Sequence, residues 1–226
     1  MYDAKKIYNE GKLLVRAMDW PSLKKGINGL EYDCTTWANE FCILNDGGLS
    51  SASSTLIVPN VGVSTYKNIG FLINSDLANC FHISKTDSCS NGDINNGDFF
   101  ASKADFQTIM ELTNYIKDSN DTTMNEVNIQ TTIDSVVGLF INECLQQNKL
   151  LQMIYVVKKC IENIIGIDYP IYSYNSKEGK INKIELTNEL EQQIIQTLKT
   201  TQLFYWPDNY DEPVINDIVV LNRYTK

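Results

Sequence analysis

The amino-acid sequence predicts an α+β domain, because short apolar segments of strand length are mixed with helical segments in no regular order. A doubly wound parallel sheet needs strands and helices in alternation, and this chain lacks that rhythm. No internal repeat or linker divides its 226 residues. Hydrophobic residues make up 43% of the chain and charged residues 21%, as in folded globular proteins. We therefore expect the whole chain to fold.

The first half of the chain begins with a predicted buried strand at residues 12–18, where an apolar run ends at Asp-Trp-Pro. A helix is expected at residues 35–44, because Trp37 and Phe41 recur at helical spacing before an Asn-Asp-Gly-Gly stop. The polar segment 84–99, rich in Asn, Gly, Asp and Ser, predicts a long surface loop. Further strands are predicted at residues 49–58, 70–73 and 79–83.

The second half of the chain is expected to hold three helices, three strands and a hairpin. One amphipathic helix at residues 104–117 is predicted to be capped by Ser102, and another at residues 187–199 by Thr187. The other predicted elements are strands at residues 126–129 and 135–141, a helix at residues 150–165, a Tyr-rich hairpin at residues 169–184 and a strand at residues 214–221.

Charge and cysteine usage exclude several function classes. The formal net charge of −9 repels nucleic acid at long range, so nucleic acid is not an expected partner. No run of about 18 apolar residues occurs, so no membrane span is expected. The six cysteines are widely spaced and only one histidine could join them, so no metal site is predicted. The thiols are expected to be mostly reduced.

Arginine is rare in this chain. Of its 19 basic residues, only Arg16 and Arg223 are arginines and the others are lysines. Arg16 ends a segment that is expected to be buried, and a buried guanidinium needs a partner. Its planar fork matches a carboxylate or a diphosphate in a way that lysine cannot. An internal salt bridge and a bound phosphate group both satisfy this requirement.

Three segments of the sequence resemble, in the same order, motifs of ADP-ribosyltransferase toxins of the cholera and pertussis type. Residues 12–19, KLLVRAMD, resemble the first strand, which ends in an arginine that binds NAD. Residues 47–53, GGLSSAS, resemble a serine-bearing strand behind the nicotinamide pocket. Residues 125–127, NEV, followed by an Ile- and Val-rich tract, resemble the strand that begins at the catalytic glutamate. The C-terminal third of the chain is unmatched.

The resemblance implies a fold and an activity. The expected fold is an ADP-ribosyltransferase-like split mixed β-sheet core with flanking helices. The catalytic core would cover residues 1–145, and residues 146–226 would form a C-terminal helical and β extension packed on the same domain. The implied activity is the transfer of ADP-ribose from NAD to a host protein side chain. The implied source is a secreted bacterial toxin or effector that acts in the host cytoplasm.

The resemblance also assigns roles to individual residues. Arg16 and Ala17, with Ser50 and Ser51, would bind NAD, and Glu126 would stabilise the positive charge that develops on the ribose. Ser50 would hold the Glu126 carboxylate in place, so Arg16, Ser50 and Glu126 are the predicted catalytic residues. One departure concerns the acceptor. Relatives that modify arginine carry a second glutamate two residues before the catalytic one, where this chain has a methionine.

Two alternative functions remain open at the level of sequence. Cys34, before a predicted helix, resembles the nucleophile of papain-like or NlpC-like cysteine hydrolases and transferases, with His82 as its base. A single histidine among apolar residues is more often a core residue. The aromatic segment 201–213 would suit a non-enzymatic protein-interaction domain, although it could equally cover its own core.

Overall fold

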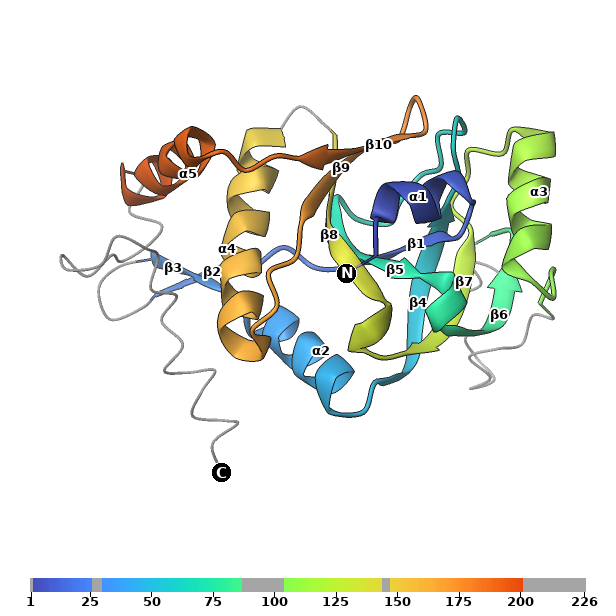
Figure 1. The fold of residues 1–226 in the computed structure, drawn as a ribbon, viewed down its shortest axis with the longest axis horizontal. Helices are drawn as coiled ribbons and strands as arrows, with labels where there is room; N and C mark the ends of the chain where they lie inside the picture. Colours follow the sequence, from blue (N-terminus) through green and yellow to red (C-terminus); the bar gives the residue numbers. More distant parts are fainter. Residues whose placement is uncertain (1, 26–29, 87–103, 144–146, 201–226) are drawn as a thin grey trace.

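The computed structural model describes residues 2–25, 30–86, 104–143 and 147–200 (Figure 1). Its centre is one eight-stranded sheet, which together with five helices confirms the α+β class. The strands of this sheet are β1 (Leu13–Ala17), β4 (Leu49–Ile57), β5 (Ile69–Asn74), β6 (Asn79–Ser84), β7 (Glu126–Thr131), β8 (Val136–Asn142), β9 (Ile171–Asn175) and β10 (Lys180–Ile184). A separate hairpin joins β2 (Ser22–Lys25) and β3 (Leu30–Asp33).

The strands follow the order β10-β9-β8-β5-β1-β4-β7-β6, which places β1 near the middle of the sheet. Only β8 and β9 run parallel, and the other neighbouring strands of this sheet are antiparallel. The sheet is therefore mixed. Because β9 pairs with β8, the C-terminal segment that ends with β10 extends the same sheet.

The helices pack around this sheet (Figure 1). Their bounds are α1 (Ala4–Asn9), α2 (Thr35–Asp46), α3 (Ile109–Ser119), α4 (Gln147–Ile165) and α5 (Asn188–Thr200). Helix α2 contacts α4 and β4, while α4 also packs on β8. Helix α1 contacts β1, β5 and β10, and α3 lies beside β6. None of the helices in the described part of the chain has the length and apolar character needed to cross a bilayer.

An aromatic cluster holds α2 against the sheet. Phe41 of α2 meets Phe71 of β5 edge to face, with ring centroids 5.1 Å apart, and meets Tyr169 at 5.7 Å. Trp37, one turn earlier, also meets Phe71 edge to face. Each such pair contributes about 0.5–1.5 kcal/mol beyond the burial of its surface. The apolar spacing seen in the sequence thus fixes which face of α2 points to the core.

Most predicted elements are present, and the differences have local causes. Helix α3 begins later than expected, at Ile109, because Thr108 and Glu111 form a capping box there. Ser102, the predicted cap, lies outside the described residues. Helix α1 and the hairpin of β2 and β3 were not predicted. The predicted strand at residues 214–221 and residues 87–99 of the predicted polar loop also lie outside the described residues.

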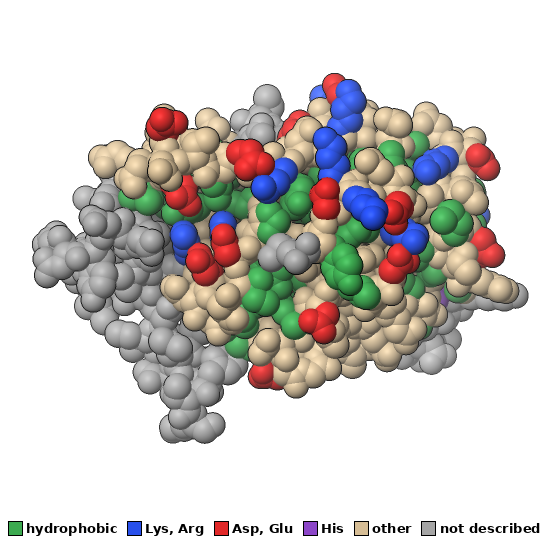
Figure 2. All heavy atoms as spheres, in the orientation of Figure 1, with side chains coloured by type: hydrophobic (Ala, Val, Ile, Leu, Met, Phe, Trp, Pro, Cys, Tyr) green, Lys and Arg blue, Asp and Glu red, His purple; other side chains and the backbone are tan. Residues whose placement is uncertain are grey.

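The face of the molecule in Figure 2 mixes charges of both signs. Lys and Arg side chains lie beside Asp and Glu side chains across it.

The hydroxyl of Tyr8 ties α1 to two loops. It lies 2.9 Å from the carbonyl oxygen of Val58 and 2.5 Å from that of Gly179, and the side chain is buried. Burial also raises the pKa of this phenol, so it stays protonated and able to donate. We expect Tyr8→Phe to lower the free energy of unfolding by about 0.5–1.5 kcal/mol, because the buried hydroxyl's hydrogen bond is lost while Gly179 O still accepts from Asn60 N at 3.0 Å.

Urea denaturation of Tyr8→Phe and of a matched control, Tyr2→Phe, measures this effect. Tyr2 is 56% exposed, so its hydroxyl is open to water and its removal should leave stability unchanged. Equal unfolding free energies for the two variants would show that the Tyr8 hydroxyl does not stabilise the fold.

Candidate functional site

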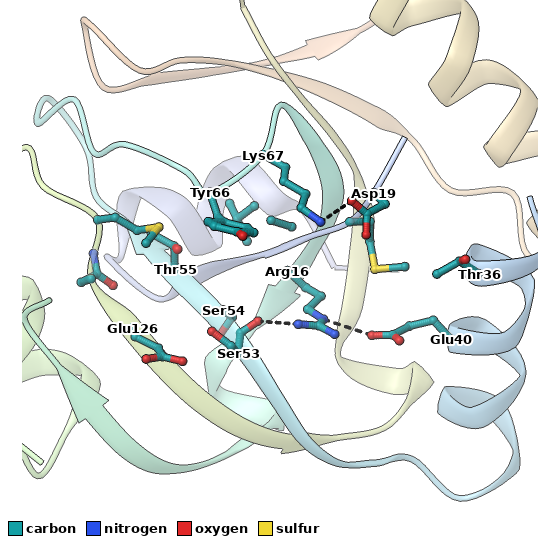
Figure 3. Close-up of a pocket in the computed structure, with 15 residues that line it drawn as sticks. Arg16, Asp19, Thr36, Glu40, Ser53, Ser54, Thr55, Tyr66, Lys67 and Glu126 are labelled. Atoms are coloured by element: carbon teal, nitrogen blue, oxygen red, sulfur yellow. Dashed lines mark hydrogen bonds and ion pairs between the residues drawn. The ribbon is translucent and has the colours of Figure 1, made fainter. Parts of the chain in front are cut away.

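A cleft of about 380 Å³ opens where β1, β4 and the start of β7 meet (Figure 3). Helix α2 forms one side of it, and the loop between β4 and β5 forms another. Its lining residues are Val15, Arg16, Ala17, Met18, Asp19, Thr36, Glu40, Ser53, Ser54, Thr55, Tyr66, Lys67, Met124, Asn125 and Glu126. The volume lies in the range of small-molecule sites, roughly 300–1,000 Å³.

Arg16 lies on β1 and reaches into the cleft with two fixed contacts (Figure 3). Its Nε donates to Oε1 of Glu40 on α2 at 3.0 Å, and its Nη1 donates to the backbone oxygen of Ser53 at 3.0 Å. The neighbouring strand approaches closely at Gly70, where a Cβ would lie 2.1 Å from the oxygen of Arg16. The partner that the sequence required for Arg16 is therefore an internal carboxylate, and Glu40 was not predicted.

Glu126 is the first residue of β7, and its side chain is buried at the opposite part of the same cleft (Figure 3). The residue before it, Asn125, is anchored to the backbone of Leu56 on β4. Its Oδ1 accepts from Leu56 N at 2.8 Å and its Nδ2 donates to Leu56 O at 3.0 Å. This paired contact fixes the place where β7 begins, and with it the position of Glu126.

The serines of β4 that line the cleft are not the ones that the sequence predicted. Ser50 and Ser51 are exposed and do not line it, whereas Ser53 and Ser54 do. The pairing of β4 with β7 shifts register between Leu49 and Ala52, and this irregularity decides which hydroxyls face the cleft. Ala17, the remaining predicted NAD contact, lines the cleft beside Arg16.

Ser53 shares a face of the sheet with Glu126. It pairs with Asn128, and alternate residues of one strand project from the same face, so Asn128 and Glu126 lie on one side. Diagonal neighbours of this kind are about 7–8 Å apart between their Cα atoms. Ser54 is engaged elsewhere, because its hydroxyl donates to the oxygen of Val127 at 2.8 Å. Of the two serines that line the cleft, Ser53 is thus the one on the same face as Glu126.

A second cation lies across the cleft from Arg16 (Figure 3). Lys67, in the loop after β4, forms an ion pair with Asp19, which follows β1. Its ammonium group also lies 5.3 Å from the ring centre of Tyr66, whose side chain is 68% exposed. The sequence did not indicate that this loop would line a site, because its residues carry no motif and no periodicity.

The comparisons with known proteins identify no family for this chain. No protein-family model matches the chain, and no curated protein matches it. Any proposal about function therefore rests on the cleft and on the motifs in the sequence.

The candidate thiol pair is not part of the cleft. Cys34 is buried directly before α2, and His82 is buried on β6, the edge strand of the main sheet. Neither residue lines the cleft. The described residues contain no group of three or more potential metal ligands. The aromatic segment 201–213 lies outside the described residues.

The anchor at Asn125 can be tested through the stability of the fold. Asn125→Ala leaves the amide and carbonyl groups of Leu56 without their side-chain partner, and each such buried group costs about 1–3 kcal/mol. We expect a lower free energy of unfolding, which thermal unfolding measures.

Asn79→Ala is the control for this variant, because the Asn79 amide makes an exposed hydrogen bond to Gln130 and lies outside the cleft. If Asn125→Ala were as stable as Asn79→Ala, the anchoring role would be refuted.

Proposed function

We propose that this chain is a mono-ADP-ribosyltransferase that cleaves NAD and transfers ADP-ribose to a protein acceptor. The observation that carries the proposal is the meeting of Arg16 and Glu126 in one cleft (Figure 3). These residues are far apart in the sequence, and the resemblance to cholera- and pertussis-type toxins singles out both of them. The serine-bearing strand β4, which the resemblance also singles out, pairs with both β1 and β7 and so runs between them.

In this proposal the reaction breaks the bond between C1′ of the ribose and the nicotinamide nitrogen. The electron pair leaves with nicotinamide, and positive charge develops on the ribose in an oxocarbenium-like transition state. The Glu126 carboxylate accepts a hydrogen bond from the ribose 2′-OH and stabilises that charge. The acceptor nucleophile then forms a bond to C1′ and loses its proton to water.

The other two roles follow from the resemblance and from the places of the two residues in the cleft. Arg16 binds the diphosphate, which fixes the dinucleotide so that the reacting carbon lies near Glu126. Ser53 takes the role that the sequence suggested for Ser50, the orientation of the Glu126 carboxylate. The support for this change is that Ser53 shares the face and the cleft with Glu126.

The resemblance extends the proposal to the biological setting. We propose that the acceptor is a host protein. We also propose that this chain is a secreted bacterial toxin or effector that acts in the host cytoplasm. Incubation with NAD labelled on its adenylate and with a eukaryotic lysate tests the activity. Covalent label on a lysate protein and release of nicotinamide are expected. A preparation that neither transfers label nor consumes NAD would refute the proposal.

Met124 bears on the choice of acceptor, because it lines the cleft two residues before Glu126. A guanidinium acceptor keeps its proton at neutral pH and needs a nearby carboxylate to assist its attack. The methionine supplies none, so we expect agmatine, a small guanidinium acceptor, not to raise NAD consumption above the rate with water alone. Nicotinamide release with and without agmatine measures this, and clear stimulation by agmatine would contradict it.

A further inference from the structure

The acid that holds Arg16 has no role in the proposed reaction, although it lines the same cleft. Glu40 accepts from Arg16 Nε at 3.0 Å, and the two side chains are 15% and 26% exposed, respectively. The pair is therefore largely buried, and its hydrogen bond holds the Arg16 guanidinium in one orientation within the cleft.

The two bonds of Arg16 use two of the five N–H hydrogens of its guanidinium. A guanidinium carries five N–H groups, one on Nε and two on each Nη. Nε donates to Glu40 and one hydrogen of Nη1 donates to Ser53 O, so within the described residues the second Nη1 hydrogen and both Nη2 hydrogens have no protein acceptor. An Nη1–Nη2 edge is the fork that binds a phosphate group through two parallel hydrogen bonds.

Glu40 lies on a helix that is packed firmly against the sheet. It lies on α2 between Trp37 and Phe41, both of which are buried. Trp37 also donates from Nε1 to the oxygen of Asp19 at 2.9 Å, which ties α2 to the chain that leaves β1. The carboxylate is thereby held relative to the strand that carries Arg16.

Electrostatic attraction alone would not hold a diphosphate in this cleft. The lining residues include two cations, Arg16 and Lys67, and three acids, Asp19, Glu40 and Glu126. A cleft with more acids than cations gains affinity for a diphosphate through directed hydrogen bonds, and those depend on the orientation of the guanidinium.

We propose that Glu40 is a positioning residue that orients the Nη edge of Arg16 toward the diphosphate of a bound dinucleotide. This inference rests on the proposed function for the identity of the ligand. Glu40 acts through Arg16 and does not touch the reacting atoms. Its loss therefore weakens nucleotide binding and leaves the turnover of bound NAD nearly unchanged.

Calorimetric binding of ADP-ribose, with NAD kinetics beside it, tests this role. Glu40→Ala is expected to raise the Kd for ADP-ribose and the KM for NAD about tenfold, the effect of one hydrogen bond to a charged group, with kcat within about twofold. Glu40→Gln keeps an oxygen acceptor at the same place, so it should restore most of the affinity. Asp46→Ala, on an exposed position of α2, is the control and should bind as the unmodified protein does.

Measuring the effect of Glu40→Ala in a protein that also carries Arg16→Ala makes the test specific. If Glu40 acts through Arg16, adding Glu40→Ala to Arg16→Ala changes the Kd no further. Tighter binding in both Glu40 variants would show that the acid competes with the ligand, and an equal loss in the Arg16→Ala background would show a purely structural role. Either result overturns the inference.

The outcome separates this inference from the proposed transferase activity. If ADP-ribose binds with the expected pattern but NAD is not consumed, Glu40 keeps its role and the transferase proposal fails. If NAD is consumed and Glu40→Ala binds normally, only the positioning role fails. If neither ADP-ribose nor NAD binds, both are wrong.

Discussion

Glu126→Gln is expected to lower the rate of NAD cleavage by about 10²–10³-fold, the loss typical when a group that stabilises transition-state charge is removed. The carboxylate is buried, where a charge interacts more strongly than in water. Glutamine has almost the same shape, so the amide should fit the site and the Kd for NAD should change little. Nicotinamide release at saturating NAD measures the rate.

The control for this variant is Glu185→Gln, which removes a carboxylate from an exposed side chain outside the cleft. It should keep the full rate. Thermal unfolding of both variants distinguishes a chemical defect from a folding defect. A folded Glu126→Gln protein with the normal rate would remove the central residue of the proposed mechanism.

Arg16→Lys is the second variant with a large expected effect. Lysine keeps the charge but lacks the planar fork, so it cannot bind Glu40, the Ser53 oxygen and a phosphate at once. We expect the KM for NAD to rise by about 10–100-fold, which corresponds to the loss of one or two hydrogen bonds between charged groups.

Steady-state kinetics with NAD, and calorimetry with ADP-ribose, measure this change. Lys183→Met removes an exposed cation on β10, outside the cleft, and is the matched control. An Arg16→Lys protein with normal affinity would mean that the charge of Arg16 suffices and that its geometry has no part in binding.

The general course of the chain could be predicted because its elements carry strong local patterns. The apolar run that ends at Arg16 predicts β1, and the spacing of Trp37 and Phe41 predicts α2. The start of α3 was misplaced, although the sequence contains the signal. Thr108 and Glu111 are three residues apart, which is the spacing of a capping box.

The positions of the serines could not be obtained from the sequence. Residues 50–55 read SSASST, so almost every position offers a hydroxyl and alternation alone does not choose a face. The choice is made by the register shift between Leu49 and Ala52, which depends on pairing with β7. That strand lies more than 70 residues away in sequence, as the distance from Ser54 to its partner Val127 shows.

Glu40 and the Lys67 loop were missed for a different reason. An acidic residue on a helix is usually solvated, and nothing local distinguishes Glu40 from such a residue. Its partner is 24 positions away on β1, so the pair exists only after α2 has packed on the sheet. Sites whose residues come from several elements depend on the tertiary structure, and local sequence patterns do not predict them.

The most direct test of the central claim is a crystal structure with an NAD analogue whose nicotinamide cannot leave. The proposal predicts that its diphosphate lies within hydrogen-bond distance of the Nη atoms of Arg16 and that its ribose 2′-OH contacts Glu126. A dinucleotide bound outside this cleft, or bound in it without touching either residue, would contradict the claim that the two act on one NAD molecule.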